Sequence, residues 1–303
     1  MIDLHCDTIL RLYSEKPEGN LLDTDCSVSI RQLEKIKALA QCFAIYTPPG
    51  DGRWQTMKDI YQRFCLEIER NSSFIRRISS PDELGRGPEP AAILTIEDMG
   101  PVDGDEKRLE EVLSWHPLIC SLIWNNENAY AYPNSLYAEI MNAPLKPAGE
   151  ALACRLNENN IVIDVSHLSD GGFWNLCSLG VKIAATHSNC RELCPHPRNL
   201  TDEMIRAIAD RGGVIGLNFC PLFLRGDDTS RIEDMVRHVK HMLNAGGEDV
   251  IALGTDFDGI EGKLEIAGTG QLPLLLQALR KEGLRESVIE KFWYRNALNF
   301  LKR

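Results

Sequence analysis

Short apolar runs alternate with amphipathic segments along the whole chain. Eight of these runs are bounded by polar or turn residues and are typical of strands: residues 2–5, 42–46, 91–97, 118–124, 161–167, 182–187, 213–219 and 250–256. Because most positions in each run are apolar, the pattern favours strands buried on both faces of a parallel sheet over antiparallel strands with one wet face.

Segments with a helical repeat of apolar residues lie between the runs. We expect helices at residues 29–40, 57–78, 148–158, 201–211 and 231–243, and a final helix from about residue 285 to residue 301. Thr201, followed by Asp202 and Glu203, indicates a helix N-terminus. The hydroxyl can cap the first turn, and the two acidic side chains suit the positive end of the helix dipole.

Eight strands that alternate with helices over 303 residues predict an α/β fold, a (β/α)8 TIM-like barrel, in preference to an open doubly wound sheet. No stretch rich in proline, glycine and serine separates two halves, so residues 1–303 are expected to form a single catalytic domain. The segment at residues 85–90 is expected to be a loop that leads into the third strand.

Composition narrows the class of protein. Hydrophobic residues make up 44% and charged residues 25%, as in ordinary folded domains, and the formal net charge of −11 argues against nucleic acid or an acidic membrane as partner. We find no apolar run of membrane-spanning length, no lipid-anchor tail and no secretory signal, so we expect a cytoplasmic protein. The ten cysteines are scattered and are expected to be reduced thiols.

Five of the eight runs end on side chains that bind metals or transfer protons. They end at His5-Cys6-Asp7, Glu97-Asp98, Ser166-His167, Thr186-His187 and Thr255-Asp256-Phe257-Asp258. In a barrel the carboxyl ends of all strands meet on one face, which holds the active site, so these residues are expected to converge. Each one alone is more simply explained as a cap, but a single metal cluster explains all five strand ends. Three histidines with several carboxylates exceed the needs of one tetrahedral zinc and indicate a binuclear metal hydrolase.

Other metal-binding patterns are weaker. His238 and His241 lie three residues apart in a predicted helix without a third ligand, and we expect them on a solvated helix face. His116 precedes the fourth run and would lie at the opposite end of the barrel. The sequence D-F-D-G from Asp256 has its glycine too early for an EF-hand calcium loop. We find no motif of a serine nucleophile, a P-loop or a dinucleotide-binding fold.

The order of these motifs resembles the membrane (renal) dipeptidase family of zinc peptidases, and in particular a cytoplasmic member of bacterial type. The resemblance rests on H-x-D, E-D, I-D-V-S-H-L-S-D, T-H-S-N-C-R-E-L-C-P-H-P-R-N-L-T-D-E, G-G-V-I-G-L-N-F and I-A-L-G-T-D-F-D-G, in that order. It covers nearly the whole chain and is most specific between His187 and Asp202. The barrel fold of that family agrees with the predicted architecture.

The resemblance also implies roles for individual residues. It implies five metal ligands: His5 and Asp7 for a first zinc ion, His167 and His187 for a second, and Glu97 as the bridge between them. Asp256 is then the acid/base group, and Arg198 pairs with the C-terminal carboxylate of the substrate, for which its planar fork of donors is suited. The implied reaction is hydrolysis of small unblocked dipeptides, including those with a D-residue at the C-terminal position, by water activated between the two metals.

One position departs from the family pattern. Where mammalian-type members have a substrate-contacting histidine after the fourth strand, this chain has Trp124, in S-L-I-W-N-N. Tryptophan has an N–H donor but neither carries a positive charge nor acts as an acid or base. Because the implied metal ligands are all present, we expect hydrolysis to be retained and Trp124 to reshape the substrate pocket.

Two alternatives stay open at this stage. The first is a related binuclear metal amidohydrolase that acts on N-acyl amino acids or other small amides. The second is a catalytically silent metal-binding barrel. Histidine and carboxylate ligands also accept manganese, cobalt or iron in place of zinc. The family resemblance suggests a homodimer.

Overall fold

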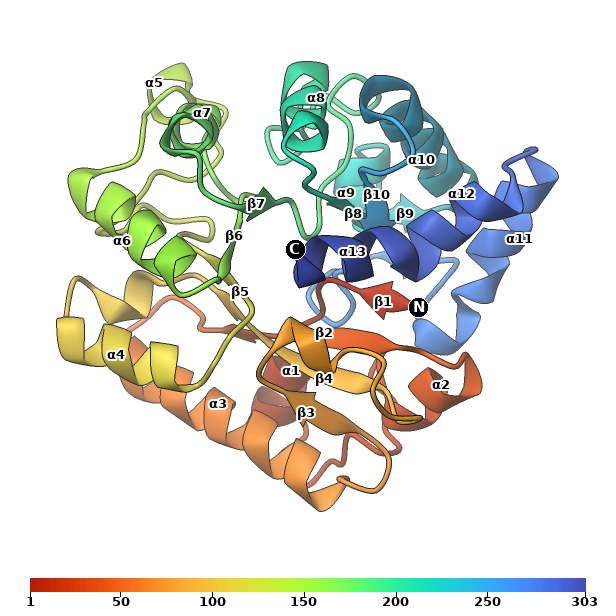
Figure 1. Ribbon diagram of the computed structural model, residues 1–303, viewed down its shortest axis with the longest axis horizontal. Helices are drawn as coiled ribbons and strands as arrows, with labels where there is room; N and C mark the ends of the chain where they lie inside the picture. Colours follow the sequence, from red (N-terminus) through yellow and green to blue (C-terminus); the bar gives the residue numbers. More distant parts are fainter.

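Eight parallel strands form a nearly closed barrel at the centre of the computed structural model, which describes all 303 residues (Figure 1). Around the barrel they follow the order β1 (Ile2–Asp3), β2 (Ala40–Tyr46), β4 (Ala91–Glu97), β5 (Ile119–Ser121), β6 (Val162–Asp164), β7 (Ile183–Ala184), β8 (Ile215–Leu217) and β10 (Ile251–Leu253). Strand β10 pairs with β1, and one bridge between Ala185 and Ile215 joins β7 to β8. The predicted fold class is confirmed, and all eight predicted strands are present, most of them shorter than predicted.

The helices surround the strands in Figure 1. They are α1 (Thr8–Ser14), α2 (Ile30–Lys35), α3 (Arg53–Arg70), α4 (Glu106–Ser114), α5 (Ala138–Met141), α6 (Pro147–Glu158), α7 (Asp170–Leu179), α8 (Asp202–Asp210), α9 (Pro221–Leu224), α10 (Ile232–Gly246), α11 (Pro273–Lys281), α12 (Glu286–Glu290) and α13 (Asn296–Lys302). The hydroxyl of Thr201 accepts a hydrogen bond from the backbone N–H of Met204, which confirms the predicted cap of α8. None of the helices combines the length and apolar character that a membrane span requires.

The predicted helix over residues 57–78 is wrong at its C-terminal end. Helix α3 stops at Arg70, and the side-chain amide of Asn71 donates a hydrogen bond of 2.8 Å to the carbonyl of Glu67. This bond satisfies one of the last free carbonyl groups of the helix, and the short polar residues that follow favour a turn. The chain then forms β3 (Arg76–Ile78), which pairs with β4. Two further strands, β9 (Thr229–Ser230) and β11 (Lys263–Leu264), form a separate parallel pair.

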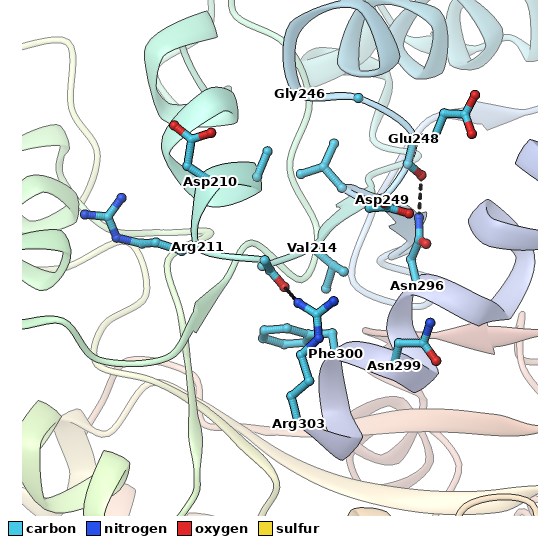
Figure 2. Close-up of a pocket in the computed structure, with 15 residues that line it drawn as sticks. Asp210, Arg211, Val214, Gly246, Glu248, Asp249, Asn296, Asn299, Phe300 and Arg303 are labelled. Atoms are coloured by element: carbon cyan, nitrogen blue, oxygen red, sulfur yellow. Dashed lines mark hydrogen bonds between the residues drawn. The ribbon is translucent and has the colours of Figure 1, made fainter.

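The C-terminal helix covers the amino end of the barrel. Phe300 and Leu301 of α13 pack in one apolar cluster with residues at or just before the starts of the strands, among them Ala91, Leu118 and Val214. A cavity of about 500 Å³ lies at this end, beside α13 (Figure 2). Helix α13 covers the amino end of the barrel. The polar residues that follow the strands lie at the other end, the carboxyl end.

Candidate metal centre and active site

The structure brings together all five side chains that the family resemblance implies as metal ligands. They come from the ends of four strands: His5 and Asp7 after β1, Glu97 at the end of β4, His167 after β6 and His187 after β7. His5 Nε2 lies 3.4 Å from Asp7 Oδ2 and 3.6 Å from Glu97 Oε2. The other carboxylate oxygen, Glu97 Oε1, lies 2.9 Å from His167 Nε2 and 3.7 Å from His187 Nε2. Residues far apart in the sequence thus form one compact cluster, as parallel strands predict.

The cluster divides into two sets of potential ligands that share Glu97. One set is His5, Asp7 and Glu97; the other is Glu97, His167 and His187. Two buried atoms of the first set, His5 Nε2 and Asp7 Oδ1, have no hydrogen-bond partner. Buried polar atoms are rarely left unpaired, and imidazole and carboxylate groups are ordinary ligands of divalent transition metals. The residues present therefore fit a two-metal centre.

Burial sets the protonation of the cluster. It lowers the pKa of His167 and of His187 well below the usual value, so both imidazoles are neutral and can offer a nitrogen lone pair to a metal. Burial, reinforced by the negative charge of Asp7, raises the pKa of Glu97 to about 8. Because a buried carboxylate is costly without nearby positive charge, the cluster favours the binding of cations.

Asp256 lies at the edge of the same cluster. It follows β10 in a left-handed backbone conformation, with φ of 62°, and its Oδ1 atom lies 3.8 Å from His5 Nε2. Its Oδ2 atom accepts a hydrogen bond of 2.8 Å from the side-chain amide of Asn218. Burial raises the pKa of Asp256 to about 6, which is a value suited to proton transfer near neutral pH.

The D-F-D-G sequence holds the first half of the cluster in place. The carboxylate of Asp258 accepts hydrogen bonds from the hydroxyl of Thr8 at 2.5 Å and from Arg11 at 2.8 Å, and so fixes the start of α1, next to Asp7. A Cβ atom at Gly259 would lie only 2.1 Å from Asp7 Oδ2, so any other residue here would displace the Asp7 carboxylate. The sequence pattern did not predict these two roles, although the aspartate and glycine that follow Asp256 were a visible signal.

A cavity of about 600 Å³ opens onto the cluster and contains the predicted substrate-contacting residues. Arg198 is only 5% exposed, makes no ion pair, and stacks over the ring of Phe223 at 5.1 Å. Its guanidinium donates to the Ser166 carbonyl and lies 3.2 Å from His167 Nε2. Trp124 lines the same cavity and packs against Tyr46, with ring centroids 4.7 Å apart and the rings tilted by 42°.

Residues outside the cluster are placed less accurately by the sequence. His238 was predicted to face solvent, but it is buried, with Nδ1 accepting from the Cys190 backbone N–H at 3.1 Å. The prediction was wrong because His238 lies three residues after Met235 and four before Met242, on the apolar face of α10. His241 is partly exposed and contacts Asp202. All ten cysteines are free thiols, as predicted.

Comparison with known proteins agrees with this geometry. The family model described as membrane dipeptidase (peptidase family M19) matches residues 1–303. An uncharacterized protein in the pqqA 5' region of Klebsiella pneumoniae is 34% identical over 267 residues, which are 84% of this chain and 96% of that protein. The dipeptidase tcpJ of Claviceps purpurea is 26% identical over 178 residues, 56% of this chain and 42% of that protein.

A similar fold is found among solved structures. A metallo peptidase from Rhodobacter sphaeroides, liganded with a phosphinate mimic of the dipeptide L-Ala-D-Ala, superimposes with a TM-score of 0.91 at 22% identity and covers 100% of this chain and 98% of that one. At this identity the likeness shows the shared fold, whereas the family model that matches residues 1–303 shows the family. The chain belongs to the membrane dipeptidase family, peptidase family M19, and is a metallopeptidase that hydrolyses peptide bonds.

Proposed function

We propose that the chain is a binuclear zinc dipeptidase that hydrolyses small unblocked dipeptides, including those with a D-residue at the C-terminal position. The observation that carries this proposal is the division of the Glu97 carboxylate, which presents one oxygen to His5 and the other to His167 and His187. The ligand of the Rhodobacter sphaeroides peptidase, a phosphinate mimic of L-Ala-D-Ala, supports the substrate class.

The five clustered residues would hold the metals. His5 and Asp7 would bind the first ion, His167 and His187 the second, and Glu97 both. Bound zinc would activate water at neutral pH and stabilise negative charge on the carbonyl oxygen. Manganese, cobalt or iron would fit the same ligands. The cytoplasmic location stays a prediction. So does the homodimer, which the family resemblance suggests.

Asp256 would move the proton. Its carboxylate would accept the proton of the attacking water and then give it to the amine that leaves. Asn218 donates to Oδ2 of Asp256, so the transferred proton would reside on Oδ1, the oxygen on the side of His5.

The walls of the cavity would select a zwitterionic dipeptide. Arg198 is buried and has no acidic partner, so the N–H donors that do not contact Ser166 and His167 are available to the C-terminal carboxylate of a substrate. Glu261, exposed at the same cavity and also without an ion pair, supports recognition of a free α-ammonium group. Trp124 would form an apolar wall beside His167, where the family pattern has a histidine.

A panel of dipeptides with free and with acylated amino groups tests this proposal. In the presence of added zinc, we expect the free dipeptides to be hydrolysed and their N-acetyl derivatives to be poor substrates. Equal or faster hydrolysis of the N-acyl compounds would favour the alternative of an amidohydrolase for N-acyl amino acids. Absence of turnover with zinc, manganese, cobalt and iron would favour the catalytically silent barrel.

A further inference from the structure

The ring of His187 contacts a buried pair of side chains behind the metal centre. Its Nδ1 atom lies 2.7 Å from the hydroxyl oxygen of Thr186, and that hydroxyl is also hydrogen-bonded to Oδ2 of Asp164. All three residues are at least 95% buried. The contact lies on the opposite side of the ring from Nε2, the nitrogen that faces Glu97 and His167.

The protons available to these groups determine which of them donates in each hydrogen bond. Ionised Asp164 can only accept, and a threonine hydroxyl has a single proton to donate. Asp164 already accepts at Oδ1 from the backbone N–H groups of Ser166 and Thr186 and from the hydroxyl of Ser166. Four donors in all suit an ionised carboxylate, so the Thr186 hydroxyl donates to Asp164 and accepts from His187 Nδ1. The proton of neutral His187 is therefore on Nδ1, and Nε2 carries the free lone pair.

We propose that Thr186 and Asp164 are positioning residues for the second metal: they hold His187 in the tautomer and ring orientation that leave Nε2 free as a ligand. This proposal rests on the two-metal centre proposed above. Partners that fix metal-binding histidines in this way commonly contribute 10- to 100-fold to metal affinity.

The backbone around Thr186 leaves little room for adjustment. A Cβ atom at Gly254 would lie 1.7 Å from the carbonyl oxygen of Thr186, and one at Gly216 would lie 1.9 Å from it. Strand β8 at Gly216 and the residue after β10, Gly254, thus approach this carbonyl closely because both positions are glycine. The hydroxyl of Thr186 is therefore held at a fixed place relative to His187.

A second threonine–aspartate pair provides a matched control. On the other side of the centre, the hydroxyl of Thr255 donates to Oδ2 of Asp3 at 2.7 Å, and both residues are fully buried. This hydroxyl contacts no imidazole nitrogen; its other contacts are the backbone carbonyl of His5 at 3.4 Å and the backbone N–H of Phe257, from which it accepts at 3.3 Å. Loss of the Thr255 hydroxyl removes the same kind of buried hydrogen bond without affecting the tautomer of a metal ligand.

The test compares Thr186→Val, Thr186→Ser and Thr255→Val in the full-length protein. Zinc content is measured by elemental analysis, the affinity of each zinc by chelator competition, and folding by thermal unfolding. We expect Thr186→Val to weaken the second zinc roughly 10- to 100-fold while the first zinc is retained. Thr186→Ser keeps the hydroxyl and should bind the second zinc as the wild type does. Thr255→Val should also bind the second zinc as the wild type does. Its unfolding temperature should fall by about as much as that of Thr186→Val.

Several results would overturn the proposal. Wild-type affinity for both ions in Thr186→Val would do so, as would equal losses of the second zinc in Thr186→Val and Thr255→Val. If Thr186→Val does not fold, loss of the second zinc in Thr186→Ser, or ¹⁵N NMR of the zinc-loaded wild type showing the His187 proton on Nε2, would contradict it. Fewer than two zinc ions in the wild type would overturn the two-metal centre itself, and the positioning role with it, so the two failures are distinguishable.

Discussion

The two ends of the barrel carry cavities of similar size but opposite character. The cavity at the carboxyl end measures about 600 Å³ and the one at the amino end about 500 Å³. At the amino end, shown in Figure 2, Asn296 donates to the carbonyl of Glu248, and Arg303 donates to the carbonyl of Gly212. The carboxylate of Glu248 pairs with Arg285 and Lys291.

At the carboxyl end, by contrast, buried polar groups lack partners. His5 Nε2 and Asp7 Oδ1 make no hydrogen bond, and Arg198 makes no ion pair. Polar groups that are paired contribute to stability, whereas buried groups that are left unpaired or have shifted pKa values indicate chemistry. In this barrel the size of a cavity does not identify the active site. The buried polar groups without partners in the cavity wall do.

The largest effect on activity should follow removal of the carboxylate charge of Glu97, which both sets of potential metal ligands share. Glu97→Gln should lower kcat/KM by more than about 100-fold, because even partners outside the ligand shell contribute 10- to 100-fold. It should also reduce the metal content while the protein stays folded. Glu248→Gln at the amino end is the matched control and should leave kcat/KM unchanged. Equal losses in both variants would contradict the distinction between the two ends.

Arg198→Lys should have the next largest effect. Lysine keeps the positive charge but loses the planar fork that binds a carboxylate with two hydrogen bonds. A lost hydrogen bond to a charged group is worth about 1.5–3 kcal/mol, so KM for dipeptides should rise roughly 10- to 100-fold. Steady-state kinetics measure this, with Arg303→Lys at the amino end as the control. An unchanged KM would exclude Arg198 from carboxylate recognition.

Trp124→His should change the preference among dipeptide substrates rather than abolish activity. The indole packs against Tyr46 and lies beside His167, so the smaller, polar ring would enlarge the cavity next to His167. We expect ratios of kcat/KM between dipeptides with large and with small side chains to change by about tenfold, as expected for altered contacts in an apolar pocket. An identical kinetic profile would contradict a role for Trp124 in the pocket wall.

The smallest effect on catalysis should come from Asn296→Ala, which affects stability instead. The amide of Asn296 donates to the carbonyl groups of Glu248 and Ile251, each at 2.8 Å, and so ties α13 to the start of β10. Leaving these buried acceptors unpaired should lower the free energy of unfolding by about 1–3 kcal/mol. Denaturant unfolding measures this loss, and KM should not change. A raised KM without loss of stability would assign the amino end a part in catalysis.

The fold and the convergence of the candidate metal ligands were predictable because each follows from a regular relation between sequence and space. Apolar runs of strand length indicated the eight strands, and parallel strands place their carboxyl ends on one face. His5, Glu97, His167 and His187 therefore had to meet, although they are separated by up to 182 positions.

The rest depends on contacts that no local pattern records. The C-terminal end of α3 depends on the side-chain bond of Asn71, and helix α1 has only seven residues, too few to show a helical repeat of apolar positions. Likewise the contact of Thr186 with both Asp164 and His187 brings together two strands, and the requirement for Gly259 arises only from its approach to Asp7.

The most direct test of the two-metal centre is the metal stoichiometry of the purified protein. Elemental analysis after zinc loading and removal of free metal should give two zinc ions per chain, and Glu97→Gln should bind less than the wild type. A wild-type content of fewer than two zinc ions per chain after loading, in folded protein, would contradict the two-metal centre.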